Sequence, residues 1–150
     1  MRRIAALLLL VLGSSLWLTG CGIVPGTTSE TCVDWVHFDS PQEVFSQAGA
    51  VVIGTPLRQD GQTSIYGYTA QAHVVESEKV LKGEAVGVTM RISAMPETCT
   101  GGVSYPDGDP LETSRRLIIF LTKDGGEWFT FTPVQGVLFF DKGTTLPFHQ

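Results

Sequence analysis

The first 20 residues carry one apolar run between a basic start and a small-residue end. Arg2 and Arg3 precede the run, which covers residues 4–12. This three-part layout is typical of a secretory signal. A membrane-spanning helix needs about 20 mostly apolar residues, whereas glycine and serine at positions 13–15 interrupt this stretch. We therefore predict a cleaved signal peptide over residues 1–20.

A short helix is predicted just after residue 40. Ser40–Glu43 combines a capping serine, a proline at the first helical position and a glutamate at the third. Gly49 is placed to end this helix after Ala48. Val44 and Phe45 give the helix an apolar side, so we expect it to cover one end of a sheet.

From residue 50 onward, apolar residues alternate with polar ones or form short β-branched runs, as in strands. A break in the alternation near Val74-Val75 predicts a bulge that lets one strand serve two sides of a closed sheet. Arg58–Ser64, which contains Asp60-Gly61, and Thr100–Ser114 are predicted loops because they are rich in turn-forming residues. The predicted strands are Ala50–Thr55, Tyr66–Leu81, Gly87–Ala94, Leu117–Leu121 and Trp128–Thr132, with Val137–Phe140 ending the core.

Five strands, one short helix and regular turn signals predict a mainly β fold, a small antiparallel barrel or sandwich. Residues 22–31 consist mostly of Gly, Pro, Ser and Thr, which is typical of a flexible tether. We expect a tether over residues 21–31 and one domain over residues 32–150, long enough for a single core.

The charge of the chain argues against nucleic acid as a partner. The full chain has a formal net charge of -5, with 10 basic and 15 acidic residues. Removing residues 1–20 removes Arg2 and Arg3 and no acidic residue, which leaves a net charge of -7. Phosphate backbones and anionic head groups would repel such a chain, because binding to them depends on clustered Lys and Arg.

No catalytic, cofactor or metal signature stands out. No serine lies in a Gly-x-Ser-x-Gly elbow, and neither Gly101-Gly102 nor Gly125-Gly126 has the lysine and following helix of a phosphate loop. His37, His73 and His149 lack the spacing of zinc ligands, so we interpret them as ordinary surface or strand residues. We predict no enzyme, no cofactor and no metal, with an unrecognised hydrolase as a distant alternative.

The loop at residues 100–114 is the best candidate for binding. It is long, and loops on a rigid β scaffold commonly carry recognition. Its candidate residues are Tyr105, Asp107, Asp109 and Glu112. The three acidic residues match no calcium loop, so a solvated acidic loop is preferred over a calcium site. A disordered insertion is the alternative interpretation of the segment.

The sequence Leu18-Thr19-Gly20-Cys21 resembles the lipobox of bacterial lipoproteins. The resemblance implies that the Cys21 thiol is joined to diacylglycerol, that the peptide is cut before Cys21, and that the new amino terminus is acylated, for example with palmitate. Several acyl chains give stable attachment. We therefore expect a lipid-anchored protein on the extracytoplasmic face of a cell membrane.

The two remaining cysteines, Cys32 and Cys99, form an even pair in an oxidising compartment, so we expect a disulfide bond. A redox-active or metal-binding pair of thiols is the alternative, but the Cys-x-x-Cys spacing is absent.

A second resemblance covers most of the predicted domain. Its elements are Cys32, Ala48–Gly54, Val80–Gly83, Glu97–Cys99 and Leu117–Leu121. This succession resembles the netrin-like module, which includes the N-terminal domain of tissue inhibitors of metalloproteinases. The resemblance implies a five-stranded OB-like antiparallel barrel, and it implies a disulfide from the first cysteine to the loop after the third strand. Cys32 and Cys99 match that bridge, whereas the family's further disulfides are absent.

The function is expected to be binding rather than inhibition by metal chelation. In the inhibitors, the residue matching Cys32 is the mature N-terminus and binds zinc through its free amine. Here Cys32 is internal, and a peptide nitrogen offers no lone pair for a metal. We expect a protein-binding or interaction module with an envelope protein as its partner. An inhibitor of an envelope protease is the alternative.

Overall fold

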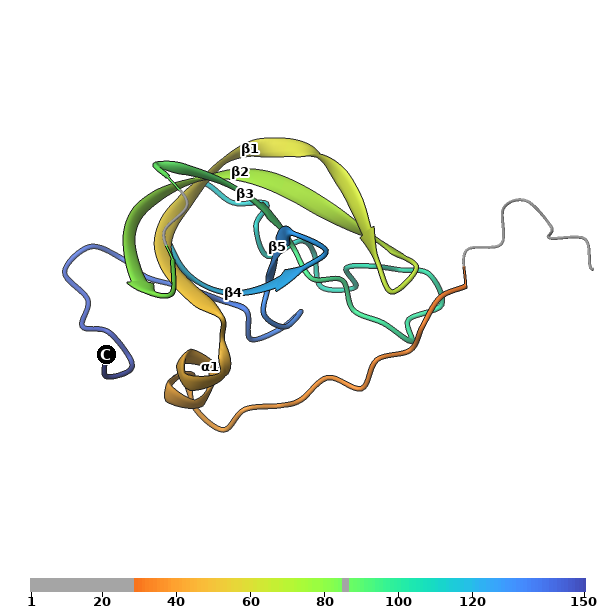
Figure 1. Ribbon diagram of the computed structural model, residues 1–150, viewed down its shortest axis with the longest axis horizontal. Coiled ribbons are helices and arrows are strands. Elements are labelled where there is room, and N and C mark those ends of the chain that lie inside the picture. Colours follow the sequence, from red (N-terminus) through yellow and green to blue (C-terminus); the bar gives the residue numbers. More distant parts are fainter. Residues whose placement is uncertain (1–28, 85–86) are drawn as a thin grey trace, which may run out of the picture.

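The computed structural model describes residues 29–84 and 87–150 (Figure 1). The protein is mainly β, as predicted. The predicted signal peptide, Cys21 and residues 22–28 of the tether lie outside the described residues. Within the part that is described, no helix is long and apolar enough to cross a membrane. The elements are α1 (Pro41–Gln47), β1 (Ala50–Ile65), β2 (Tyr68–Lys82), β3 (Thr89–Ser93), β4 (Leu117–Asp124), β5 (Glu127–Thr130) and β6 (Val137–Phe139).

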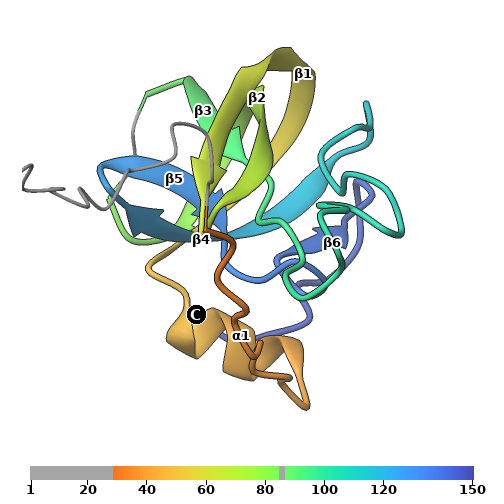
Figure 2. The ribbon, with the colours of Figure 1, turned by 90° about the vertical axis from the view of Figure 1, so that its right-hand side faces the viewer.

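The strands form one mixed sheet that closes into a ring (Figures 1 and 2). The strand order is β1-β2-β3-β5-β4-β6, and β1 also pairs with β4 through Ala50–Gly54. Five strands therefore form the ring, and β6 adds to β4 as a sixth. The expectation of a purely antiparallel sheet is wrong. Strand β5 is antiparallel to β4 but lies beside β3 in a parallel orientation.

Two layers of apolar side chains hold the ring together. Side chains on successive positions of a strand point to opposite faces, and both faces are buried where Ala50–Gly54 of β1 pairs with the first five residues of β4. Val52 and Ile119 belong to the cluster that fills the interior, whereas Val51 and Phe120 belong to the cluster on the outer face. This double burial explains why residues 50–53 and 117–121 are continuous apolar runs.

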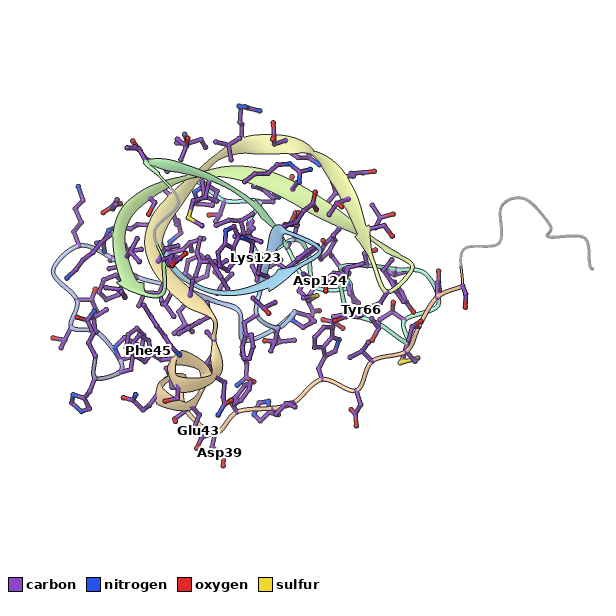
Figure 3. All side chains as sticks on the ribbon, viewed as in Figure 1. Asp39, Glu43, Phe45, Tyr66, Lys123 and Asp124 are labelled. Atoms are coloured by element: carbon purple, nitrogen blue, oxygen red, sulfur yellow. A yellow bond between two sulfur atoms is a disulfide. The ribbon has the colours of Figure 1, made fainter. Side chains whose placement is uncertain are left out.

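Helix α1 covers the outer face of β1 and β4 rather than one end of the sheet. Its Val44 and the following Ala48 pack in the outer cluster. Phe45, labelled on the helix in Figure 3, also packs against this cluster. Its ring stacks on that of Phe148, with ring centroids 4.4 Å apart. The predicted cap is confirmed, because the Ser40 side chain accepts a hydrogen bond from the Glu43 amide.

The predicted loop at Arg58–Ser64 is wrong, because β1 runs unbroken to Ile65 and pairs with β2 along its length. The Asp-Gly signal marks a register shift between Gln59 and Gln62, where Gly61 has a φ of 81°. A positive φ serves a bulge as well as a turn. The chain reverses later, at Tyr66-Gly67, whose φ values are 56° and 86°.

The bulge expected near Val74-Val75 lies on the neighbouring strand. Pro56 pairs with Val75 and Arg58 pairs with Val74, so the extra residue is Leu57 on β1. Strand bounds elsewhere differ from prediction by a few residues: β2 begins at the third residue of its predicted range, β3 begins at Thr89, and β4 extends to Asp124.

The N-terminal segment is fastened along the ring between the β1–β2 turn and α1 (Figure 1). Cys32 and Cys99 form the predicted disulfide, with Cα atoms 5.0 Å apart and a sequence separation of 67. Beside it, Val33 exchanges two hydrogen bonds with the Thr98 hydroxyl, at 2.9 and 2.8 Å. The Thr31 amide donates to the Tyr66 carbonyl at 2.7 Å. The disulfide therefore ties the N-terminal segment to the loop that follows β3.

Replacing both Cys32 and Cys99 with serine is expected to lower the free energy of unfolding by about 4 kcal/mol, because the bridge closes a long loop in the unfolded chain. Urea unfolding of the non-reduced protein measures the loss. Unfolding with and without reductant is the control. Reductant should destabilise the native protein and leave the stability of the double variant unchanged. Equal unfolding of the native protein with and without reductant would contradict the expectation.

Candidate functional site

A cleft of about 610 Å³ lies between β1 and the loop that leads into β4. Ligand pockets in proteins usually have volumes of about 300–1,000 Å³. A second hollow, between Trp35 and Val134, measures about 220 Å³ and falls below this range. The larger cleft is therefore the candidate site. It is lined by Pro56, Leu57, Arg58, Gln59, Gln71, His73, Tyr105, Gly108, Asp109, Leu111, Glu112, Thr113 and Ser114.

The cleft exists because β1 extends beyond the residues that pair with β4. β4 begins at Leu117, opposite Gly54, whereas β1 continues to Ile65. Over residues 55–65, the edge of β1 away from β2 pairs with no strand in the described part of the chain. The loop before β4 lies across from this edge without pairing to it, and the cleft is the space between them.

Leu111 fixes the floor of the cleft. Its side chain is fully buried and belongs to the interior cluster with Val75, Ile92 and Leu117. The loop before β4 therefore dips into the ring and closes its mouth, while the residues on either side of Leu111 stay at the surface. The fully buried anchor makes this part of the loop a fixed wall.

His73 and Asp109 form a buried pair beside Leu111. On β2, His73 lies opposite Ile92 of β3, so it shares the interior face of the ring. The His73 Nε2 atom lies 2.7 Å from Asp109 Oδ2, and the two side chains are 5% and 7% exposed. The other carboxylate oxygen of Asp109 accepts a hydrogen bond from the Leu111 amide at 2.8 Å. One carboxylate thus joins the loop to β2 and turns Leu111 inward.

Tyr105 anchors the other end of the same loop. Its hydroxyl accepts a hydrogen bond from the Gln71 amide at 2.9 Å and donates one to the Ala94 carbonyl at 2.7 Å. Burial raises the pKa of the Tyr105 hydroxyl well above its ordinary value, so the group stays neutral and able to donate. The hydroxyl therefore forms its hydrogen bonds within the fold rather than with a ligand.

The four predicted loop residues have different positions. Tyr105, Asp109 and Glu112 line the cleft, whereas Asp107 is exposed and lies outside it. Asp109 is occupied by His73, but the exposed Glu112 carboxylate forms no ion pair within the described residues. Nor do any three His, Cys, Asp or Glu side chains of residues 29–84 and 87–150 gather as metal ligands would.

His73 is the site residue that the sequence interpretation missed. His37 and His149 are exposed, as expected, but His73 is 4% exposed. The alternation of Tyr68, Ala70 and Ala72 was expected to continue into the core at Val74, whereas the interior residues there are His73 and Val75. The long β2 strand buries one face near its start and the other face further on. The break in alternation near Val74-Val75 was the available signal.

The arrangement is suited to binding. A histidine held by a carboxylate is a common acid–base unit that activates a hydroxyl, a thiol or a water molecule. Within the described residues, no serine, threonine or cysteine side chain forms a hydrogen bond with His73. The Thr113 hydroxyl instead accepts a hydrogen bond from the Arg115 amide at 3.2 Å. The Asp109 carboxylate bonds both His73 and the Leu111 amide, so the pair holds a wall of the cleft.

No protein-family model matches the chain, and no curated protein and no solved structure matches it either.

Replacing Asp109 with alanine is expected to lower the free energy of unfolding by about 1–3 kcal/mol, because it leaves the buried His73 without its partner. Asp107→Ala is the matched control, two residues earlier in the same loop and exposed. Its effect should stay within about 0.5 kcal/mol. Urea unfolding of both variants measures the difference, and equal stabilities would show that the buried pair does not hold the loop.

Proposed function

We propose that this protein is a membrane-anchored, extracytoplasmic lipoprotein whose domain is a protein-binding or interaction module. The observation that carries the proposal is the cleft of about 610 Å³ on a closed ring of strands, with one wall fixed by Leu111 and the His73–Asp109 pair. A rigid scaffold with a hollow beside a long loop is a common way to present a binding surface.

We also propose that the ring is an OB-like barrel of the netrin-like type. Closure of five strands through the β1–β4 pairing supports this assignment, because an OB-fold is a five-stranded, partly open barrel. The Cys32–Cys99 bridge, from the first segment to the loop after β3, agrees with it. Strand β6 and α1 are additions outside this ring.

The membrane anchor is proposed from the sequence around Cys21. Eight residue-to-residue steps lead from Cys21 to Ser29, where the described chain begins. At about 3.6 Å per residue, they reach at most about 29 Å. The net charge of -7 without residues 1–20 argues against nucleic acid and against direct adhesion to anionic head groups. The domain would therefore be held near the lipid by its acyl chains.

The inhibitor and hydrolase alternatives gain no support from the described residues. The amide of Cys32 is part of a peptide bond, so zinc chelation through a free amine is unavailable. The His73–Asp109 pair has no nucleophile bonded to it among the described side chains. Binding in the cleft is the function that remains with a specific observation behind it.

Replacing Cys21 with serine is expected to release the protein from membranes, because the acyl chains would have no attachment point. Fractionation after a high-salt wash measures the change. Cys32→Ser is the control, since it removes a different cysteine and should leave the protein in the membrane fraction. A Cys21→Ser protein that still pelleted with membranes would contradict the anchor.

A photo-crosslinking residue at Ser114 is expected to capture a specific envelope protein, because Ser114 is exposed and lines the cleft. The same residue at Gln47, exposed on α1 and outside the cleft, is the control. Gel shifts after illumination of whole cells report the adducts, and mass spectrometry identifies them. If both positions gave the same adducts, or Ser114 gave none, the binding proposal would fail.

A further inference from the structure

We infer that the cleft takes an extended segment of a partner protein, which lies along the edge of β1 as an added strand and sets a basic side chain against Glu112. This inference rests on the proposed binding function and specifies the form of the ligand. It is carried by the unpaired strand edge, by the shape of the cleft and by the charge on its far wall.

The strand edge is the first observation. The cleft is lined by four consecutive residues of β1, residues 56–59, and their edge away from β2 pairs with no strand in the described chain. Four residues of a strand extend about 13 Å. An unpaired edge offers main-chain hydrogen bonds to a second extended chain, which is the basis of recognition by strand addition.

The side chains of the cleft suit the same ligand. Leu57, the bulged residue of β1, has a side chain that is 54% exposed and lines the cleft. Gln59 and Gln71 also line it and form a hydrogen bond with each other. An apolar contact at Leu57 beside polar amides fits a chain of alternating side chains better than a wholly apolar molecule.

The charge on the walls favours a basic residue in the ligand. Arg58 is paired with Asp60 at 2.7 Å, and this guanidinium holds the pKa of Asp60 below its ordinary value, so the pair is neutral overall. Asp109 is occupied by His73. The exposed Glu112 is then the lining carboxylate without an ion pair in the described chain, on a domain that is acidic overall.

The edge is poorly suited to a second copy of this chain. Pro56 has no amide hydrogen, Leu57 forms a bulge, and the charged Arg58 follows. Proline, bulges and charges are devices that keep sheet edges from pairing with each other over long stretches. A short segment seated between β1 and the loop needs only part of that edge, so a partner of different sequence is favoured.

Single-stranded nucleic acids fit less well. Stacking on aromatic faces supplies much of the affinity for unpaired bases, and among the described residues that line the cleft Tyr105 is the single Phe, Tyr or Trp. Tyr105 is already anchored through its hydroxyl. Phosphates would also meet a negatively charged domain.

Selection of peptides on the full-length lipoprotein in nanodiscs tests the inference. Random nonapeptides displayed on phage are the probe, and the strongest binder is synthesised for titration. We expect a Lys or Arg at a shared position, whose replacement by Glu weakens binding about two- to fivefold. Glu112→Gln should remove this difference, whereas Glu84→Gln, at an exposed residue outside the cleft, should keep it.

Backbone methylation tests the strand addition itself. N-methylation of alternate amides of the selected peptide should weaken binding about tenfold in one register and little in the other. Equal effects of the two registers, no effect of Glu112→Gln, failure to select any peptide, or displacement of the selected peptide by tetra-N-acetylglucosamine would each overturn the inference. If Ser114 still crosslinked an envelope protein in such a case, the inference alone would fail. If the Ser114 crosslink were also absent, the proposed binding function would be contradicted as well.

Discussion

The pairing of β1 with β4 is the interaction on which the rest of the structure depends. It joins only Ala50–Gly54 to the first five residues of β4, yet it closes the ring and gives both strands a buried interior face. Because β1 continues to Ile65 while β4 begins at Leu117, closure at one end leaves the other end open. The cleft, its strand edge and the loop that crosses the mouth all follow from this difference in length.

An open mouth exposes an apolar interior, and the loop before β4 resolves this by inserting Leu111. The segment around Leu111 is polar, so its insertion brings a carboxylate to the buried face of β2. Burial of an unpaired polar group is costly, and the 2.7 Å contact between His73 and Asp109 offsets that cost for both residues. Two apolar residues of similar size could match the pair in stability. A hydrogen-bonded pair differs in that it sets the position of the loop, and with it the wall that carries Glu112.

The parts of the fold that depend on neighbouring residues were predictable from the sequence. Helix α1 follows from Ser40, Pro41 and Glu43, all within one turn, and the disulfide follows from counting cysteines. Gly61 was misinterpreted because a positive φ serves a turn and a bulge equally, and only the pairing of β1 with β2 distinguishes them. His73 was missed because its burial comes from Ile92 and Asp109, which are distant in sequence. Of the predicted loop residues, Asp107 was included because proximity in sequence does not fix which way a loop side chain faces.

In the proposed lipoprotein, the position at which the N-terminal segment joins the ring would link the cleft to the membrane. Thr31 bonds to Tyr66 at the β1–β2 turn, so the tether begins at the free end of that hairpin (Figure 1). Six residue-to-residue steps along β1 lead from Ile65 to Gln59 at the cleft, a distance of about 20 Å along a strand. The tether from Cys21 to Thr31 spans at most about 36 Å, so the cleft of a molecule anchored as proposed would stay within about 65 Å of the lipid surface. Attachment of this kind would restrict the cleft to partners that are themselves near the membrane. It would also raise their effective concentration, so that a short strand edge and one carboxylate would suffice for the proposed binding, which would be weak in free solution.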